Sequence, residues 1–305
     1  MSDPLFAGID GGGSSLRVAI VDARLATIAT QSAGTANPSI SGREGAQAHI
    51  RATVRATLRQ AGIAPERIAA AGIGIAGASN LHSKDWLLAT LAPVLPSARL
   101  VPSSDLEIAL VGALGRRHGI LLLAGTGSAA YGCAPGGQRL QVGGWGYLLG
   151  DEGSGYWMGM QLLRGITAAY DQDIGLTELG AACLDALELE TARDLVGWLY
   201  RGNEAAPARV AKLARLVLDV ARTGDDEAKR LVAAAARHLA KQVEWLRSQL
   251  DYPCAPIAFA GGLLEADNAL CAAVTRQLNL PEQPKALHSP AIGAALLAQL
   301  EWSGA

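Results

Sequence analysis

The chain has 305 residues, half of them hydrophobic, with 26 Lys and Arg against 28 Asp and Glu and a formal net charge of -2. This length is more than one hydrophobic core usually serves, so about two domains are expected. The near-neutral charge and the lack of a basic run or a long apolar stretch give no support to nucleic-acid binding, membrane-surface binding or a membrane span.

The first half of the chain predicts elements in the order βββαβαβα. Two apolar runs, residues 4–9 and Leu16–Val21, flank a glycine-rich turn, and the second run alternates with the period of a strand. Further strands are expected at residues 25–31, 70–75 and 99–102, and helices at residues 43–61, 86–95 and 106–114.

The second half starts the same plan again. A buried strand at residues 120–124 enters a second glycine turn, and later elements follow in a similar order. These are strands at residues 129–133, 140–142 and 256–260, a helical block over residues 153–250, and helices at residues 264–278 and from Ser289 onward.

The repetition predicts a duplicated α/β architecture. Residues 1–117 are expected to form the first domain and residues 118–288 the second, with the last helix, residues 289–305, packing back on the first. Sequence identity between the halves is slight, so the repeat is one of architecture. A cleft between the halves would let both glycine turns face one ligand.

The glycine turns exclude two familiar nucleotide motifs. A Rossmann fingerprint leads into a helix, whereas the first turn here leads into the strand Leu16–Val21. A P-loop ends in Gly-Lys-Ser/Thr, and neither turn contains lysine. Each turn alone could be a tight hairpin. As a pair they predict two β-hairpin phosphate loops, in which glycines let backbone N–H groups approach an oxyanion.

Three motifs in order carry a resemblance to a known superfamily. Asp-Gly-Gly-Gly-Ser-Ser at residues 10–15, Ala-Gly-Thr-Gly-Ser at residues 124–128 and Ala-Gly-Gly at residues 260–262 resemble the two phosphate motifs and the adenosine motif of the sugar kinase/actin/heat-shock ATPases. The segment at residues 143–154, with Gly34-Thr35-Ala36-Asn37, resembles the N-acetylglucosamine kinases. The wider group includes glucosamine kinases and the activator ATPases of 2-hydroxyacyl-CoA dehydratases and benzoyl-CoA reductases.

The resemblance implies duplicated ribonuclease H-like (actin-like ATPase) domains around a central nucleotide cleft that binds ATP and Mg²⁺. Asp10 would hold Mg²⁺, most simply through water, because a carboxylate beside a phosphate cradle needs a cation between them. The nucleotide-binding residues implied are Asp10, Gly11, Gly12, Gly13, Ser14, Ser15, Gly125, Thr126, Gly127, Ser128, Gly261 and Gly262.

Asp105 is the candidate general base. It follows a strand and opens a helix, and the matching Asp takes the proton of the acceptor hydroxyl in the resembled family. The alternative is that Asp105 is a helix N-cap, as its Ser103-Ser104-Asp105 context suggests. Leu106 and Glu107 follow it where the resemblance leads us to expect small residues.

The amino-sugar acceptor would need several hydrogen bonds and a partly apolar wall. Trp145 could form that wall or pack under its loop, and Asp151 and Glu152 could instead complement a helix dipole. The substrate-binding residues implied are Asn37, Gly77, Asp105, Gly144, Trp145, Gly146 and Asp151.

The expected activity is ATP-dependent phosphorylation of an amino sugar, N-acetyl-D-glucosamine to its 6-phosphate first. Glucosamine kinase, an activator ATPase and a non-catalytic sugar sensor are the alternatives. Four dispersed cysteines without a Cys-x-x-Cys pair disfavour an iron–sulfur cluster, zinc and a disulfide scaffold. With no signal-peptide pattern, a cytoplasmic protein is expected, and the resemblance implies a homodimer.

Overall fold

The computed structural model of the protein describes residues 3–12, 15–76, 83–200 and 206–303. The chain divides into two compact units. The first unit comprises Met1–Gly119 and Ala286–Ala305, and the second comprises Ile120–Lys285. The chain therefore leaves the first unit after Gly119 and returns to it for its last helix.

The first unit is built on five strands, β1 (Leu5–Gly11), β2 (Leu16–Val21), β3 (Thr27–Ala33), β4 (Ile68–Ile75) and β5 (Arg99–Ser103). Their order in the sheet is β3-β2-β1-β4-β5. The pairs β1–β2 and β2–β3 are antiparallel, whereas β1–β4 and β4–β5 are parallel. The carboxyl ends of β1, β4 and β5 consequently meet at one edge of the sheet.

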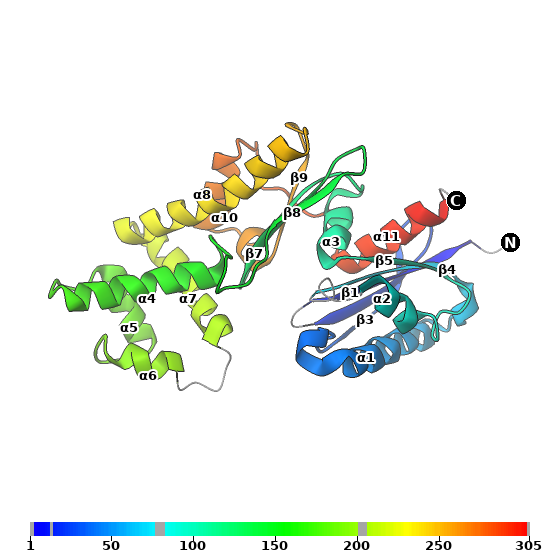
Figure 1. Cartoon of the computed structure of the whole chain (residues 1–305), viewed down its shortest axis with the longest axis horizontal. Coiled ribbons are helices and arrows are strands. Elements are labelled where there is room, and N and C mark those ends of the chain that lie inside the picture. The colour runs from blue at the N-terminus through cyan, green and yellow to red at the C-terminus, as the bar shows by residue number, and fades with distance from the viewer. Residues whose placement is uncertain (1–2, 13–14, 77–82, 201–205, 304–305) are drawn as a thin grey trace. The chain divides into compact units, whose positions relative to one another are not determined.

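Helices cover both faces of this sheet. They are α1 (Pro38–Ala61, kinked at Gly42), the short 3-10 helix η1 (Pro65–Arg67), α2 (Ser83–Leu91), α3 (Asp105–Leu114) and α11 (Pro290–Ser303). Ile9 of β1 packs in a buried cluster with residues of α1 and α2. Phe6, three residues earlier in β1 and so on the opposite face, packs instead with residues of α11, and Figure 1 shows α3 and α11 side by side. The period of two along β1 thus sends alternate side chains to two helix layers.

Helix α11 lies directly on strand backbone. A Cβ on Gly8 would lie 1.8 Å from the carbonyl oxygen of Ala291, and a Cβ on Gly72 would lie 2.0 Å from that of Ala294. Any larger residue at these two strand positions would force the helix away. The C-terminal helix is therefore an integral part of the layer behind β1 and β4.

The second unit contains a four-stranded sheet made of β6 (Gly119–Ala124), β7 (Ser128–Cys133), β8 (Arg139–Gly143) and β9 (Ile257–Ala260). The order is β8-β7-β6-β9, with β7–β8 antiparallel and β6–β9 parallel. When the strands of each unit are numbered from that unit's own first strand, both sheets contain the order third, second, first, fourth: β3-β2-β1-β4 in the first unit and β8-β7-β6-β9 in the second. The repeated architecture expected from the glycine turns is thus present in the two sheets.

The helices of the second unit form one large apolar core with its sheet. Helices α4 and α7 pack together, as do α8 and α10 (Figure 1). The helices are α4 (Gly155–Asp171), α5 (Glu178–Ala186), α6 (Asp194–Tyr200), α7 (Ala206–Thr223), α8 (Asp226–Gln249), α9 (Gly262–Glu265) and α10 (Ala269–Gln277).

Several predicted elements differ in their bounds from the structure: α1 begins at Pro38 rather than at residue 43, and α2 spans Ser83–Leu91 rather than residues 86–95. Two other differences have a clear local reason. The third strand begins at Thr27 rather than at residue 25, because the Asp22 carboxylate accepts the backbone N–H groups of Arg24 and Ala26 and holds a turn. The helix expected at residues 264–278 is two helices, α9 and α10. Asn268 ends the interval between them by capping α10, since its side chain accepts the N–H of Cys271.

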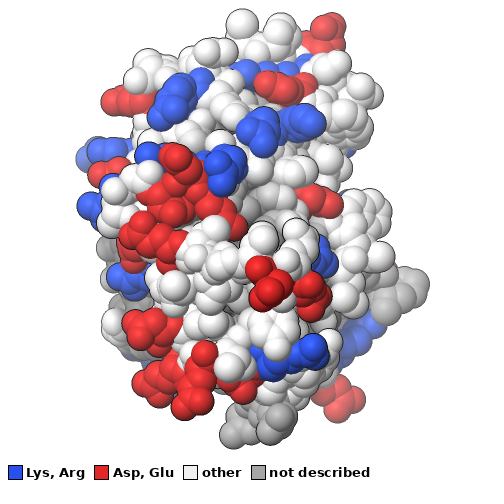
Figure 2. Space-filling view, turned by 90° about the vertical axis from the view of Figure 1, so that its left-hand side faces the viewer, with Lys and Arg blue, Asp and Glu red and all other residues white. Residues whose placement is uncertain are grey.

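Within the described part of the chain, no helix is both long enough and apolar enough to cross a membrane. Figure 2 shows one face of the molecule, on which acidic and basic side chains are interspersed among uncharged ones. On that face neither sign of charge forms an unbroken field.

Candidate active site

The first half of the candidate site lies where the parallel strands of the first unit end. Asp10 of β1 is in register with Gly74 of β4, and Gly74 is in register with Ser103 of β5. A Cβ on Gly74 would lie 2.6 Å from the carbonyl oxygen of Ser104. Glycine at this position therefore lets the turn after β5 fold over β4 and brings Asp105 toward Asp10.

Asp105 is the first residue of α3, and Ser104 is its N-cap. The Ser104 side chain accepts the backbone N–H of Glu107, which is the usual N-cap contact. The alternative that Asp105 itself is the cap is therefore wrong. The Asp105 carboxylate accepts hydrogen bonds from its own N–H and from that of Leu106, and it remains half-buried at the helix start.

The electrostatics of this edge are unusual, because the half-buried carboxylate of Asp105 acts on the buried carboxylate of Asp10. Burial raises the pKa of Asp10 to about 6; Arg17, whose Nη1 lies 4.0 Å from Asp10 Oδ2, lowers it, and the nearby Asp105 charge raises it. Burial also raises the pKa of Asp105, against its two backbone hydrogen bonds. Such a pair is suited to a divalent cation or to accepting a proton.

The first glycine turn is held by backbone hydrogen bonds. The Gly12 N–H donates to the Ser15 carbonyl at 2.8 Å, and the Gly11 carbonyl accepts the N–H of Ala76 at 2.7 Å. A Cβ on Gly11 would lie 2.4 Å from Cδ1 of Ile75, so the turn closes tightly against the end of β4. Gly13 and Ser14, both expected to contact phosphate, lie outside the described residues.

Asn37 lies on a loop tied to this turn. The Thr35 hydroxyl donates to the Gly12 carbonyl at 3.4 Å and accepts the Asn37 N–H at 3.1 Å. The His49 ring also contacts the Thr35 carbonyl, with Nδ1 at 3.1 Å. Thr35 therefore links the candidate sugar-binding Asn37 to the candidate phosphate turn. Gly77, another residue expected to bind the sugar, lies outside the described residues.

The second glycine turn, in the second unit, rests on the start of α4. The Gly125 and Thr126 carbonyls accept the N–H groups of Gly155 and Tyr156, at 2.8 and 3.2 Å. The Ser128 hydroxyl donates to the Glu152 carbonyl at 2.9 Å. These contacts fix the turn at a helix N-terminus, which is a favourable place for an anion.

Asp151 connects this turn to the loop that follows β8. Its carboxylate accepts the backbone N–H groups of Ser128 and Gly146; burial raises its pKa and these hydrogen bonds oppose the rise. The side chain is buried, and its backbone is left-handed with φ of 64°. A Cβ on Gly127 would lie 2.6 Å from Asp151 Oδ2. The carboxylate thus fills the space under the second glycine turn.

The loop between β8 and α4 exposes large apolar side chains. Trp145 is 73% exposed, so it does not pack under its loop, and Leu148 and Leu149 are 79% and 80% exposed. Gly144 and Gly146, with φ of 72° and 85°, shape the turn around Trp145. The loop therefore presents an apolar surface beside the backbone groups expected to hold the sugar.

The third glycine motif meets the second at one edge of the sheet. Gly261 follows β9 with φ of 85°, and a Cβ there would lie 2.4 Å from the carbonyl oxygen of Ala124. Since β6 and β9 are parallel, Gly261 and Gly125 emerge at the same end. Nothing lies within 4 Å of the place a Cβ on Gly262 would take, which leaves open space beside that backbone.

The predicted site residues therefore fall into two sets, one in each unit. The set in the first unit is Asp10, Gly11, Gly12, Ser15, Asn37 and Asp105, and the set in the second unit is Gly125, Thr126, Gly127, Ser128, Gly144, Trp145, Gly146, Asp151, Gly261 and Gly262.

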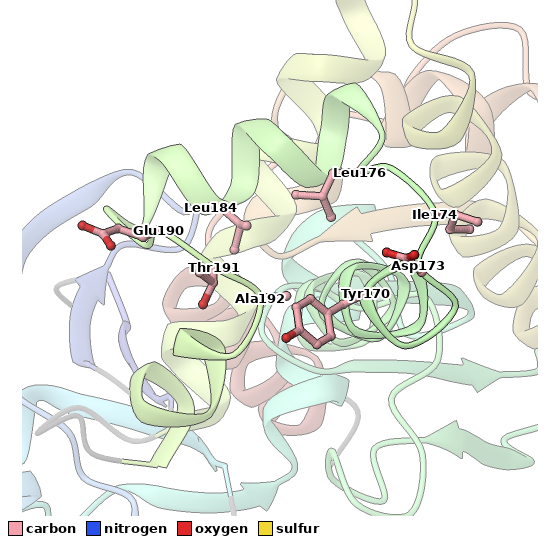
Figure 3. A pocket seen from close by; sticks show the side chains of 8 residues that line it. All are labelled: Tyr170, Asp173, Ile174, Leu176, Leu184, Glu190, Thr191 and Ala192. Carbon is pink, nitrogen blue, oxygen red and sulfur yellow. The ribbon is translucent and has the colours of Figure 1, made fainter.

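A cavity of about 490 Å³ elsewhere in the second unit contains none of these residues. Figure 3 shows Tyr170 beside Thr191 and Ala192, with the Glu190 carboxylate pointing away from the other side chains. The cavity is lined by Tyr170, Asp173, Ile174, Leu176, Leu184, Glu190, Thr191 and Ala192. No Lys or Arg is among them to hold a phosphate.

Three contributing residues were not predicted. Gly74 and Ser104 position the turn before Asp105, and Arg17 faces Asp10. Ser104 could have been found as a cap from its place three residues before Glu107, the capping-box spacing. Gly74 and Arg17 act through register across the sheet, which no local pattern of the sequence reveals.

Asp10 should reduce stability at neutral pH when no cation is bound. Folding raises the pKa of Asp10 to about 6, so the protonated carboxyl is favoured in the folded state. The stabilisation gained from that proton is complete below about pH 4 and is lost as the pH rises through about 6, where the buried carboxylate becomes charged. We expect metal-free Asp10→Asn to be more stable than the wild type at pH 8, by at most about 3 kcal/mol, and no more stable at pH 4. Denaturant unfolding at the two pH values tests this, and a gain that did not depend on pH would contradict it.

The two sheets of matching order, each with a glycine turn after its first strand, define a duplicated actin-like ATPase fold of the kind found in sugar kinases. The profile of the BadF/BadG/BcrA/BcrD ATPase family matches residues 7–298, and the chain belongs to this family. The resemblance drawn from the three glycine motifs is thereby confirmed.

Individual relatives cover almost the whole chain. The N-acetylmuramic acid/N-acetylglucosamine kinase of Clostridium acetobutylicum is 30% identical, over 96% of this chain and 98% of its own. The N-acetyl-D-glucosamine kinase of Dictyostelium discoideum is 28% identical, over 98% of each. The crystal structure of a Chromobacterium violaceum protein assigned as an N-acetylglucosamine kinase superposes with a TM-score of 0.75, at 29% identity, over 97% of this chain and 99% of that one.

Proposed function

We propose that this protein is an ATP-dependent amino-sugar kinase, with N-acetyl-D-glucosamine as its first candidate acceptor and the 6-phosphate as product. The observation that carries this proposal is the pairing of Asp10 with Asp105 at the edge where β1, β4 and β5 end. The kinase names of the relatives that cover nearly the whole chain support the choice of amino sugars.

In this mechanism Asp105 is the general base. The acceptor oxygen at C6 forms a bond to the γ-phosphorus, the bond from that phosphorus to the β–γ bridging oxygen breaks, and ADP leaves. The C6 hydroxyl proton passes to the Asp105 carboxylate. The raised pKa of Asp105 suits it to take a proton, and its place in the first turn of α3 fixes its direction.

The residues present fit a magnesium nucleotide. Asp10 is buried, which makes its charged form costly, and the positive charge of Arg17, 4.0 Å away, offsets only part of that cost. A divalent cation beside the carboxylate would therefore be favourable. When bound, Mg²⁺ would neutralise phosphate charge. The turns at residues 10–15 and 125–128 would hold the phosphates by backbone N–H groups, and Gly261 and Gly262 would lie against adenosine.

The sugar would need hydrogen-bond partners and an apolar wall. Asn37 would hydrogen-bond a hydroxyl, and the backbone at Gly144 and Gly146 would supply further contacts, while Trp145 would provide the apolar wall. Gly77 and Asp151 are the remaining residues that we propose to contact the sugar. A homodimer working in the cytoplasm remains the expected state.

A kinase assay on purified protein tests the proposal. ATP with N-acetylglucosamine, glucosamine, N-acetylmuramic acid or glucose would be supplied with Mg²⁺, and ADP formation and sugar phosphate would both be measured. Turnover with an N-acetylated sugar, well above the sugar-free ATPase rate, is the expected result. A preference for glucosamine would correct the substrate, and no sugar-dependent turnover would rule the kinase out.

A further inference from the structure

A network of charged side chains is attached to the Asp105 turn through Ser103, and the proposed mechanism does not use it. The Glu107 side chain is only 8% exposed; its Oε2 accepts the Ser103 hydroxyl at 2.7 Å, and its Oε1 lies 3.7 Å from Nη2 of Arg117. Arg117 also pairs through Nη1 with Glu301 of α11. Arg99 of β5 joins the far end, 3.6 Å from Glu301.

Glu107 fastens both residues that precede Asp105. Its side chain holds the hydroxyl of Ser103, and its backbone N–H holds the hydroxyl of Ser104. These two contacts limit rotation of the chain on the N-terminal side of Asp105. The direction of the Asp105 carboxylate therefore depends on where Glu107 is held.

Helix α11 supplies a fixed reference for this network. Helices α3 and α11 cross at two glycines, since a Cβ on Gly293 would lie 2.1 Å from the Ile108 carbonyl oxygen and 2.4 Å from the Gly112 nitrogen. The same α11 rests on the backbone of Gly8 in β1, the strand that carries Asp10. Through Arg117 and Glu301, Glu107 is thus tied to the element that lies behind Asp10.

We propose that Glu107 and Arg117 are positioning residues, which hold the Asp105 turn in a fixed place relative to α11 and β1. This inference rests on the proposed function, because it concerns the working geometry of the base. A group that acts through position matters because a misplacement of about 1 Å at a reacting centre can cost about a hundredfold in rate.

Stability alone is a poor reason for a carboxylate at residue 107. Burying a charge pair costs desolvation free energy, and well-packed apolar residues often serve a core as well or better. A buried Glu that accepts one hydroxyl and faces one guanidinium does, however, permit few arrangements of the chain around it. The main effect of the network is therefore to fix the position of Asp105, and not to stabilise the fold.

The test compares Glu107→Gln and Glu301→Gln with the wild type. The first substitution retains a side-chain oxygen for the Ser103 hydroxyl but removes the charge that faces Arg117, and Glu301 is 32% exposed, so both variants should fold. We expect kcat for the sugar to fall about tenfold in Glu107→Gln and severalfold in Glu301→Gln, with the KM for ATP within twofold. Because both act through Arg117, the double variant should lose little more than Glu107→Gln.

Glu227→Gln is the matched control. Glu227 also lies in the first turn of a helix, α8, and also accepts a hydroxyl, that of Thr177. It belongs to neither candidate set, so its kcat should equal that of the wild type. Glu107→Gln with unchanged kcat, or with a loss matched by Glu227→Gln, would overturn the positioning role while leaving the kinase proposal intact.

A readout independent of turnover separates the two proposals. Hydrogen exchange at the backbone amides of residues 103–108 should be faster in Glu107→Gln and in Glu301→Gln than in the wild type, whether or not a sugar is phosphorylated. Unchanged exchange there in both variants would overturn the inference. A wild type that phosphorylates no sugar would overturn the kinase proposal alone.

Discussion

Replacing Asp105 with Asn is expected to lower kcat for sugar phosphorylation by about 10²- to 10⁴-fold, which is the usual contribution of a general base. Asn has nearly the same shape and can keep an oxygen toward the Leu106 N–H, but it cannot take the acceptor proton. Nucleotide affinity should stay within about threefold, because Asp105 is not among the residues expected to hold ATP. Steady-state kinetics with the best sugar substrate and a fluorescent-nucleotide titration measure the two effects.

Asp226→Asn is the control for this substitution. Asp226 is the first residue of α8 and follows the N-cap Asp225, as Asp105 follows Ser104. Losing a carboxylate from that position at the helix start should leave kcat unchanged, since Asp226 belongs to neither set of site residues. Activity of Asp105→Asn close to that of the wild type would remove Asp105 from the role of base.

The pH dependence of the wild type gives the same residue a second test. A base must be unprotonated, so kcat/KM falls as the pH drops through its pKa. Burial raises the pKa of Asp105, which moves this acidic limb above the position expected for an exposed Asp. The limb should be lost from the residual activity of Asp105→Asn, and a limb of the same midpoint in the variant would assign the titration to another group.

Local pattern was sufficient to predict much of the fold. The alternation over Leu16–Val21 identified β2, and hence a glycine turn between strands rather than before a helix. The order of elements in the first unit follows the same signals, because apolar periodicity and glycine are properties of neighbouring residues. The repeated motif then indicated the second sheet, whose order repeats that of the first.

Contacts distant in sequence were beyond such signals. Judged from their sequence neighbours, Gly8 and Gly72 are only weak strand formers. Glycine is nevertheless required at both positions, because α11, more than 200 residues later, lies on their backbone. Likewise, composition left Asp105 open as a helix cap, and the structure shows that Ser104 has that role and that Asp105 is the first residue of the helix. Nothing in the sequence around the buried Glu107 indicated its ion pair with Arg117, or that Arg117 also pairs with Glu301 of α11, because both contacts arise from tertiary packing.

Asp151 was expected to bind the sugar or to complement a helix dipole, and its contacts give it a further, structural role. Its carboxylate joins the backbone of Ser128, in the second phosphate turn, to that of Gly146, in the loop with the candidate sugar contacts. Removing the acceptor would leave the buried Ser128 N–H without it, at about 1–3 kcal/mol, and would also release the N–H of the exposed Gly146. One substitution could therefore disturb two ligand sites at once.

Asp151→Ala is accordingly expected to lower the melting temperature and to raise the KM for ATP and for the sugar together, each by about tenfold or more, because a loss of about 1.4 kcal/mol in binding is tenfold in affinity. Asp151→Asn should be milder, because Asn keeps one acceptor oxygen and tolerates the φ of 64° better than Ala. Thermal unfolding and initial rates over a matrix of ATP and sugar concentrations measure all three quantities.

The control for backbone strain is Asp251→Ala. Asp251 is exposed, and its φ of 47° gives it the same left-handed conformation without a place in either set of site residues. Its substitution should cost some stability and leave both KM values unchanged. If Asp151→Ala raised only the KM for the sugar, at an unaltered melting temperature, Asp151 would be a sugar ligand alone. A joint rise, absent from Asp251→Ala, would show that one carboxylate holds the phosphate turn and the sugar loop in a common arrangement, so that disorder in either reaches the other.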